Sequence, residues 1–145
     1  MTALTVQMAR TLSGFVLNLD VQFSLSGVTG ILGPSGAGKT TLLRAIAGLD
    51  AVQIGCIQFA DTLWFDSAQR VNLPTHKRAV GYVFQDARLL PFTDVAGNLR
   101  FAEKRSRHRA RLIDWQDVVD TLDLGALLKR MPQSLSGGER QRVAL

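Results

Sequence analysis

The 145-residue sequence lacks several features that would place it in a special class of proteins. Its single cysteine, Cys56, excludes an internal disulfide and is typical of a reducing compartment. The longest charge-free stretch, between Asp20 and Lys39, contains five glycines and Pro34, unlike a membrane span of ~20 apolar residues. Residues 1–10 alternate between apolar and polar side chains and carry their only positive charge at Arg10, so they lack the basic-then-apolar order of a secretory signal. With 46% hydrophobic residues, the chain is predicted to be one globular domain that stays in the cytoplasm.

Charge is concentrated in one place. The formal net charge is +5, and five of the basic residues lie within eight positions: Lys104, Arg105, Arg107, Arg109 and Arg111. Without this cluster the acidic and basic side chains are equal in number, so the basic character is local. No aromatic residues are interleaved with the cluster for base stacking, so the sequence predicts a solvated face and no nucleic-acid partner. Anionic lipid headgroups or a protein partner remain alternatives for it.

The N-terminal half has the pattern of strands around one helix. Near-alternate apolar residues predict edge strands over Val6–Met8 and Phe15–Phe23. A short apolar run predicts a strand over Val28–Leu32, which a glycine-rich loop connects to a helix over Thr40–Ala47. Gly48 is predicted to end this helix in the left-handed conformation.

The second half is predicted to change from strands to helices. One or two strands are expected over Ile54–Phe65 and another over Ala79–Phe84. Residues Thr93–Lys129 favour helix, and this block ends at Pro132. Its amphipathic face is predicted to consist of Leu112, Trp115, Val118, Val119 and Leu122.

A phosphate-binding loop is the first motif that indicates chemistry. Residues 33–40 match the pattern of Gly, four residues and Gly-Lys-Ser/Thr. Glycines let successive amide hydrogens converge on phosphate oxygens, and the following helix directs its positive end at the same anion. Lys39 is expected to reach the β and γ phosphates, and Thr40 to ligate Mg²⁺. The predicted nucleotide-binding residues of this loop are Gly33, Pro34, Ser35, Gly36, Ala37, Gly38, Lys39, Thr40 and Thr41.

A second motif spans Leu135–Gln141. Ser136 and Glu139 have the spacing of a capping box, which begins many helices. Gly137 and Gly138 in the first helical turn cost ~1 kcal/mol each relative to alanine, so a purely structural role does not explain them. They are consistent with a ligand that approaches the backbone closely, and a serine hydroxyl at a positive helix end suits a terminal phosphate.

With these two motifs the sequence resembles the nucleotide-binding subunits of ABC transporters. The resemblance implies an α/β P-loop NTPase of ABC type, with a mixed sheet around the phosphate loop, an antiparallel β part and a helical insertion. It also implies that ATP and Mg²⁺ bind and that two such domains pair head to tail. The signature of one chain then completes the nucleotide site of the other in trans, through Ser136, Gly137, Gly138 and Gln141.

Two further residues take their roles from this resemblance. Gln85 follows the apolar run that ends at Phe84, where the family has its Q-loop glutamine, and the resemblance implies that it contacts Mg²⁺ or the attacking water. Lys39 and Gln85 are therefore the expected catalytic residues. Phe15 lies where the family places an aromatic ring that stacks on adenine, although core packing is an equal alternative.

The segment 76–100 is most similar to the ATP-binding subunits of bacterial molybdate importers. This similarity implies an ATPase at the cytoplasmic face of the inner membrane. Its expected partners are a second copy and integral membrane permease subunits, which dock against residues 87–98. A periplasmic substrate-binding protein is an indirect partner.

The acidic strand and glutamate that the P-loop mechanism requires do not follow Gln141, so the chain is expected to be an N-terminal fragment. Asp66 is the nearest internal substitute, but it precedes the signature and Ser67 follows it, so it is not assigned to metal. The expected organisation is one nucleotide-binding domain, 1–145. It comprises a strand-rich core over 1–86, a helical subdomain over 87–134, and the signature with the following helix over 135–145.

Two alternatives differ in class from a transport ATPase. A catalytically inactive nucleotide-binding or interaction module would carry the same loop without turnover. A DNA-repair ATPase shares the signature but has a long coiled coil before it, whereas fifty residues without sustained heptads lie between Gln85 and Ser136 here. His76 and His108 lack metal-ligand spacing and are expected at the surface.

Overall fold

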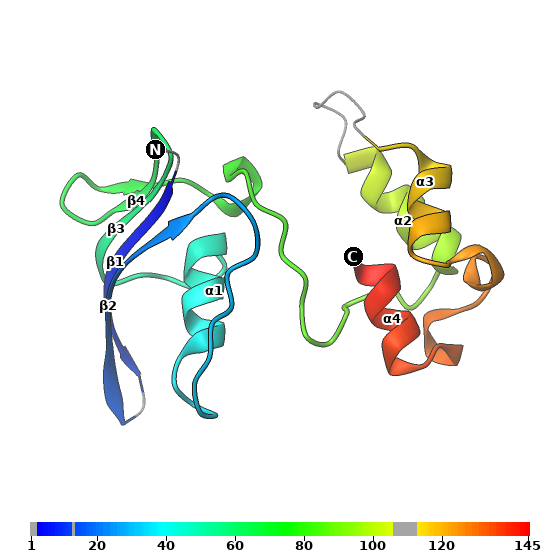
Figure 1. The fold of residues 1–145 in the computed structure, drawn as a ribbon, viewed down its shortest axis with the longest axis horizontal. Helices are drawn as coiled ribbons and strands as arrows, with labels where there is room; N and C mark the ends of the chain where they lie inside the picture. Colours follow the sequence, from blue (N-terminus) through cyan, green and yellow to red (C-terminus); the bar gives the residue numbers. More distant parts are fainter. Residues whose placement is uncertain (1–2, 13, 106–112) are drawn as a thin grey trace. The chain divides into compact units, whose positions relative to one another are not determined.

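The chain forms two compact units, Met1–Tyr82 and Val83–Leu145 (Figure 1). The computed structural model describes residues 3–12, 14–105 and 113–145. Each unit has its own cluster of buried apolar side chains.

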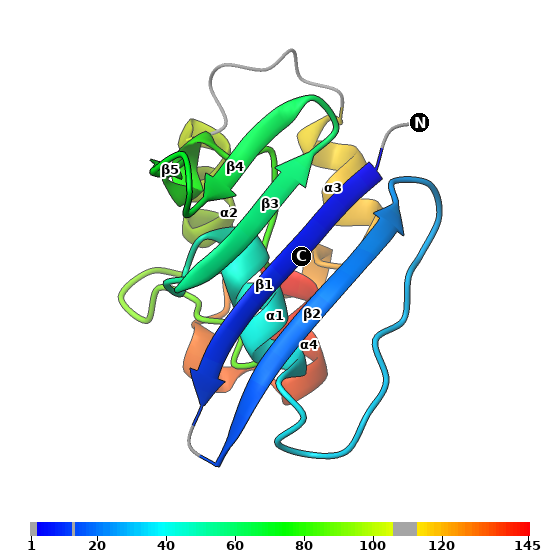
Figure 2. The ribbon, with the colours of Figure 1, turned by 90° about the vertical axis from the view of Figure 1, so that its left-hand side faces the viewer.

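The first unit contains an antiparallel five-stranded sheet with the strand order β2-β1-β3-β4-β5 (Figure 2). The strands are β1 (Ala3–Leu12), β2 (Phe15–Ser24), β3 (Ile54–Phe59), β4 (Thr62–Asp66) and β5 (Val71–Asn72). β1 and β2 pair along their whole length, from Ala3 opposite Ser24 to Leu12 opposite Phe15. The strands predicted over Val6–Met8 and Phe15–Phe23 are therefore confirmed. The region Ile54–Phe65 contains two strands.

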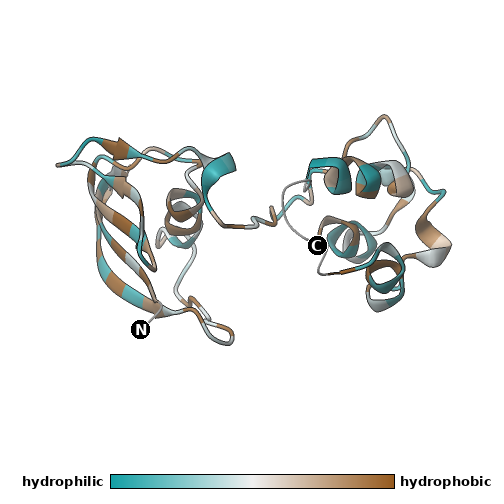
Figure 3. Cartoon of the chain, turned by 90° about the horizontal axis from the view of Figure 1, so that it is seen from above, coloured by the Kyte–Doolittle hydropathy of each residue, from teal (hydrophilic) through white to brown (hydrophobic). Residues whose placement is uncertain are grey.

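Helix α1 (Lys39–Ala47) packs its apolar side against one face of this sheet (Figures 1 and 2). Leu42, Ala45 and Ile46 are buried together with strand residues such as Val6 and Ile57. Hydrophobic and hydrophilic residues alternate along the strands, so one face of the sheet supplies this core (Figure 3). Gly48 ends α1 with φ +73°, which confirms the predicted left-handed cap.

Three strand predictions are corrected. β1 lies between β2 and β3, so it is not an edge strand. Val28–Leu32 is not a strand, and Val28 and Leu32 are 100% and 96% exposed. Ala79–Phe84 also has no strand structure. The physical reason is that an apolar run becomes a strand only where a neighbouring strand accepts its backbone hydrogen bonds, and within the described ranges no strand pairs with either segment.

The second unit is helical. Its helices are α2 (Val95–Arg105), α3 (Trp115–Thr121) and α4 (Gly137–Ala144), and its short 3-10 helices are η2 (Gly125–Leu127) and η3 (Pro132–Ser134). The 3-10 helix η1 (Thr75–Lys77) belongs to the first unit. The buried core comprises Val95, Val119, Leu124, Leu127, Leu135 and Val143. In its described residues, the predicted helical block over Thr93–Lys129 forms two helices and a 3-10 turn.

On the predicted amphipathic face of the block, Val119 is buried and Trp115 and Leu122 pack against the core. Leu112 lies outside the described residues, as do His108 and three arginines of the basic cluster, Arg107, Arg109 and Arg111. Of the helices that the structure describes, none has the length and apolar character needed to cross a membrane.

Candidate functional site

The phosphate-loop motif lies directly before α1. Gly38 is the residue before the first helical turn and has φ +89°, a conformation that favours glycine. Because it has no side chain, it makes no capping hydrogen bond to the helix, and the first turn contains no acidic residue. The amide hydrogens and positive end of α1 are therefore not neutralised by the chain itself, which is the arrangement that suits an anionic ligand.

The Leu17 side chain on β2 leaves no room for a side chain at Gly38. A Cβ atom added to Gly38 would come within 3.1 Å of both terminal carbons of Leu17. Leu17 is buried, and Phe15 projects from the same face of β2 because side chains two residues apart share a face. Phe15 is 41% exposed, so the strand that contacts the loop also carries a partly exposed aromatic ring.

The Lys39 side chain folds over the loop that precedes it. Its ammonium donates hydrogen bonds to the carbonyl oxygens of Gly33 at 2.8 Å and Pro34 at 2.7 Å. An ammonium has three N–H donors, so these two bonds leave one for a ligand. The loop is further closed by a bond from the Ala37 amide to the Pro34 carbonyl.

The remaining loop residues are accessible. Ser35 and Gly36 are exposed, Thr40 is exposed in the first turn of α1, and Thr41 is half-buried. A hydroxyl oxygen is one of the hard ligands that Mg²⁺ prefers, so the Thr40 side chain fits the metal role that its motif predicts.

The sequence reasoning missed an ion-pair cluster at the last turn of α1. The Asp50 carboxylate accepts hydrogen bonds from Arg44 at 2.7 Å and 2.9 Å and from Arg10 of β1 at 3.1 Å. The hydrogen bond from Arg44 lowers the pKa of Asp50 and raises that of Arg44. This cluster links α1 to the sheet. The separation of 40 residues between Arg10 and Asp50 leaves no local signal for it.

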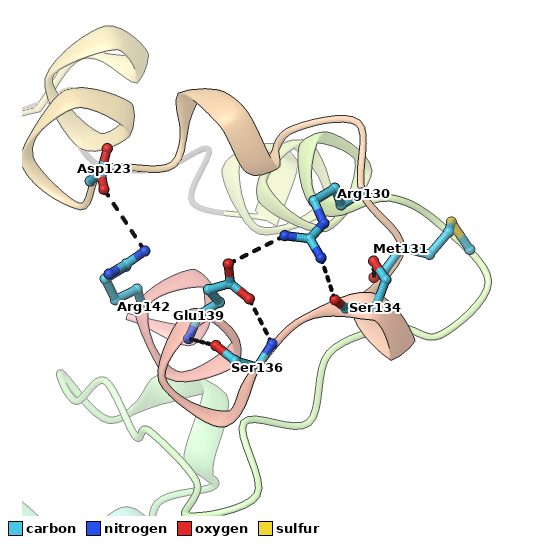
Figure 4. Close-up of polar contacts among 7 residues, drawn as sticks. All are labelled: Asp123, Arg130, Met131, Ser134, Ser136, Glu139 and Arg142. Atoms are coloured by element: carbon cyan, nitrogen blue, oxygen red, sulfur yellow. Dashed lines mark hydrogen bonds and ion pairs between the residues drawn. The ribbon is translucent and has the colours of Figure 1, made fainter.

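In the second unit, the signature motif forms the capping box that its spacing predicts (Figure 4). The Ser136 hydroxyl oxygen accepts from the Glu139 amide at 3.3 Å, and the Glu139 carboxylate accepts from the Ser136 amide at 2.6 Å. The hydroxyl proton is not used in this box, so Ser136 retains one donor at the start of α4.

Arg130 supports the capping box from the preceding segment (Figure 4). Its guanidinium lies 3.3 Å from a Glu139 carboxylate oxygen and donates to the Ser134 carbonyl. The bond from the Ser136 backbone is the main reason why the pKa of Glu139 lies below its usual range, and the charge of Arg130 contributes to the same shift. At the other side of α4, Arg142 and Asp123 are 3.9 Å apart, a weak ion pair.

The two signature glycines have no structural requirement in the described part of the chain. Neither has a positive φ, and a Cβ added to Gly137 or Gly138 would meet no atom within 4 Å. Alanine would therefore fit at both positions and favour the helix. Bare backbone at these positions is consistent with a ligand that comes from outside this chain.

Gln85 lies on a tight turn in the second unit. The Ala87 amide bonds to the Phe84 carbonyl, and the next residues, Ala87 and Arg88, have φ of +56° and +41°. Non-glycine residues in this conformation carry strain that concentrates at functional sites.

Gln85 also lines a cavity of about 290 Å³. The other lining residues are Asp86 and Ala87 from the same turn and Gly137, Arg140 and Gln141 from α4. Within this unit the structure therefore brings the predicted glutamine together with signature residues, a proximity that sequence spacing did not indicate.

Asp66 has a structural role in the first unit. Its carboxylate accepts hydrogen bonds from the Ala68 and Gln69 amides and from the Gln69 side chain. The bond from the Gln69 amide is the main reason why the pKa of Asp66 is lowered. Among the residues that the structure describes, no three His, Cys, Asp or Glu side chains are grouped so that they could hold a metal ion.

The fold and motifs define a class of protein. The sequence model of the family described as "ABC transporter" matches residues 16–145, and the chain belongs to this family. This confirms the resemblance on which the sequence interpretation depends.

The chain is also similar to individual proteins over most of its length. The chain is 47% identical over 133 residues to "Molybdenum import ATP-binding protein ModC 1" of Azotobacter vinelandii, covering 92% of this chain and 37% of that protein. It is 44% identical over 144 residues to "Molybdenum import ATP-binding protein ModC" of Albidiferax ferrireducens, covering 99% of this chain and 39% of the relative. The Bordetella pertussis protein of the same name is 48% identical, covering 90% and 36%. The chain thus spans well under half the length of these relatives.

A solved structure has the same fold. The ATP-binding cassette MJ0796, determined as a dimer in a post-hydrolysis state bound to ADP and Pi, matches with a TM-score of 0.72. The match covers 97% of this chain and 66% of the cassette, with 21% sequence identity. The α/β fold class of ABC type is confirmed by this likeness.

Proposed function

We propose that this chain is part of the ATP-binding and ATP-hydrolysing subunit of an ABC importer that takes up molybdate. The observation that carries the proposal is the phosphate loop, in which Lys39 closes over its own backbone at the uncapped start of α1. Relatives named as molybdenum import ATP-binding proteins support the transport role and the cargo.

In the proposed mechanism, the amide hydrogens at the start of α1 and the Lys39 ammonium bind the β and γ phosphates of ATP. Thr40 and the amide oxygen of Gln85 would hold Mg²⁺, and the bound ion would neutralise phosphate charge. Phosphoryl transfer to water then depends on positioning and charge stabilisation, and Gln85 orients the attacking water. Phe15 stacks on the adenine, a role supported by its partial exposure on the strand that contacts Gly38.

The signature motif of one subunit binds the nucleotide that a second copy of the subunit holds. Ser136 keeps a hydroxyl donor, and Gly137 and Gly138 leave the backbone open, so the start of α4 binds the terminal phosphate held by a partner's loop. Gln141 lies one helical turn further along α4 and completes this contact surface. A cassette of the same fold was solved as a dimer bound to ADP and Pi, which supports the pairing of two subunits.

The subunit is proposed to act at the cytoplasmic face of the inner membrane. Residues 87–98 contact integral permease subunits, and the periplasmic protein that delivers molybdate is an indirect partner. Pairing of two ATP-loaded subunits moves the permease, and hydrolysis separates them.

Retention of radiolabelled ATP on filters tests the proposal. The full-length protein is expected to retain ATP. Lys39→Ala is expected to lose most of this retention, because the variant lacks the ammonium group that binds the phosphates. Lys77→Ala is the matched control, since Lys77 is exposed in η1, outside the loop. Equal retention by the Lys39→Ala and Lys77→Ala variants would contradict a nucleotide site at this loop.

A further inference from the structure

The first unit contains a buried cation, Arg78, which is 6% exposed and in the described part of the chain has no carboxylate partner. Its guanidinium donates five hydrogen bonds, and all the acceptors are neutral oxygens of the first unit. They are the carbonyl oxygens of Leu73, Ala45, Ile46 and Trp64 and the side-chain oxygen of Asn72. Arg78 therefore places one positive charge inside this unit.

This charge lies at the C-terminal end of α1. Nη1 donates to the Ala45 carbonyl at 3.0 Å and to the Ile46 carbonyl at 2.7 Å, both in the last turn of the helix. The guanidinium also fills the space beside Gly48, where an added Cβ would lie 2.8 Å from the guanidinium carbon. Carbonyl oxygens at a helix C-terminus carry the negative end of the helix dipole, so Arg78 neutralises that end of α1.

The charge of Arg78 is less screened by water than the other charges at this helix end. Arg10 and Arg44 share the Asp50 carboxylate, and all three side chains are partly exposed. Burial lowers the pKa of Arg78, but a guanidinium remains protonated in proteins. The field of a buried cation acts through the apolar core beneath α1, where its effect is larger than at the surface.

The other end of α1 is the start of the phosphate loop's helix. It has no side-chain cap and no acidic residue in its first turn. The helix has nine residues and is about 13 Å long. At that distance and an effective dielectric constant of about 20, one charge changes the affinity for a monovalent anion about tenfold before salt screens it. Neutralising the negative end of α1 should therefore strengthen anion binding at its positive end.

We propose that Arg78 raises the affinity of the phosphate loop for nucleotide by neutralising the C-terminal end of α1. The inference rests on the proposed function, because it takes the anion at the start of α1 to be a nucleotide phosphate. Arg78 acts through the helix and lies at its opposite end, so it is not a catalytic residue. All the contacts that carry the inference lie within the first unit.

Neutral and charged replacements of Arg78 in the full-length protein separate charge from hydrogen bonding. Arg78→Gln keeps polar donors but removes the charge, and Arg78→Met is a second neutral variant if the first does not fold. Measured without Mg²⁺, the Kd should rise about fivefold for ATP and about threefold for ADP, because the effect scales with ligand charge and is reduced by salt. Arg78→Lys keeps the charge but cannot make five directed bonds. It should lower the melting temperature and change the Kd for ATP by less than about twofold.

Lys77→Met is the matched control, since it removes one positive charge from the exposed neighbour of Arg78 in η1. Water screens this charge, so the Kd for ATP should change by less than about twofold. Equal losses of affinity in Arg78→Lys and Arg78→Gln would show that the hydrogen bonds matter and the charge does not. That result, or an unchanged Kd in the neutral variants, would overturn the inference.

A thiol at the start of α1 gives a readout that needs no nucleotide. Thr40 is exposed in the first helical turn, so Thr40→Cys in a Cys56→Ser background introduces a single thiol there. The positive end of a helix lowers the pKa of a thiol, and the rate of alkylation against pH measures it. Arg78→Gln should raise the pKa of this thiol, and Arg78→Lys should not.

The thiol measurement also keeps the two proposals apart. A thiol pKa that is the same with and without the Arg78 charge would overturn the inference, whatever the protein binds. If the unaltered protein failed to bind ATP, the proposed function would fall. The nucleotide role of Arg78 would fall with it, and the thiol pKa alone would decide whether Arg78 strengthens the positive end of α1.

Discussion

Gly38 and Leu17 lie so close that the first residue cannot carry a side chain without moving the second. An added Cβ at Gly38 would come within 3.1 Å of two Leu17 carbons, and the left-handed φ of Gly38 is itself unfavourable for alanine. The start of α1 is therefore positioned by strand β2, and the shape of the phosphate loop depends on the core of the first unit.

Gly38→Ala is expected to destabilise the protein and to weaken ATP binding. The strain at a positive φ costs about 1 kcal/mol, and the contact with Leu17 adds to it by displacing the loop. Gly27→Ala is the matched control, because Gly27 has φ +73° but no neighbouring atom within 4 Å of an added Cβ. Denaturant unfolding and ATP titration of both variants measure the difference. Equal ATP affinities would show that the Leu17 contact does not shape the loop.

Gly138→Ala should lower ATP turnover without lowering the stability of the fold. In the described chain the added methyl group meets nothing within 4 Å, and alanine favours a helix by up to ~1 kcal/mol over glycine. The melting temperature should therefore stay the same or rise, while ATP turnover of the full-length protein falls because a partner's nucleotide can no longer approach the backbone.

Gly125→Ala controls for this experiment, since Gly125 in η2 also has open space around an added Cβ. It should leave turnover unchanged. A Gly138→Ala protein with full turnover would contradict close approach of a ligand at the signature.

The capping box predicts a specific pH dependence. The pKa of Glu139 is lowered below its ordinary value of 4.5 because its carboxylate accepts from the Ser136 amide. The stabilisation is therefore complete above about pH 4.5 and disappears as the pH falls through the lowered pKa. Melting curves between pH 6 and pH 3 should show that the stability advantage of the unaltered protein over Glu139→Gln shrinks on acidification.

Asp61→Asn is the control for this pH series, because Asp61 is an exposed carboxylate in the turn between β3 and β4. The Asp61→Asn series shows how far the loss of one carboxylate outside the box changes the melting curves. A constant gap between Glu139→Gln and the unaltered protein would show that the ionised carboxylate of Glu139 does not add to the stability of the box.

The fourth prediction concerns Asn98 of α2, which is buried at 9% exposure. Its side chain accepts from the Leu90 amide at 2.7 Å and donates to the carbonyls of Leu90, Thr93 and Asp94. Asn98→Ala should cost about 1–3 kcal/mol of unfolding free energy, because it leaves a backbone amide without its acceptor. Asn18→Ala, at an exposed position of β2, should cost less than about 0.5 kcal/mol. Similar losses in the two variants would contradict this role for Asn98.

Local sequence patterns predicted those elements whose interactions are local. The helix over Thr40–Ala47, its glycine cap and the capping box at Ser136 each depend on residues within a few positions of one another. The strand predicted over Val28–Leu32 failed because strand propensity does not specify which segment supplies the neighbouring hydrogen bonds.

The site residues also differ in whether their contacts are local in the sequence. The motif spacing identified Lys39 as a loop residue, and its bonds to Gly33 and Pro34 span six positions or fewer. Arg78 has the local pattern of an exposed charge beside Lys77, yet its partners in α1 lie 32 and 33 positions earlier. Burial of that charge is decided by tertiary packing, for which a single sequence contains no periodic signal.

The hydrogen bonds around Ser136 affect the entropy of ligand binding at the start of α4. Its amide and hydroxyl oxygen are already bonded to Glu139, which Arg130 holds in turn. The rotational freedom of Ser136 and Glu139 is therefore lost when the chain folds and not when a phosphate binds. The start of α4 is preorganised, so a ligand binds with a smaller entropy cost.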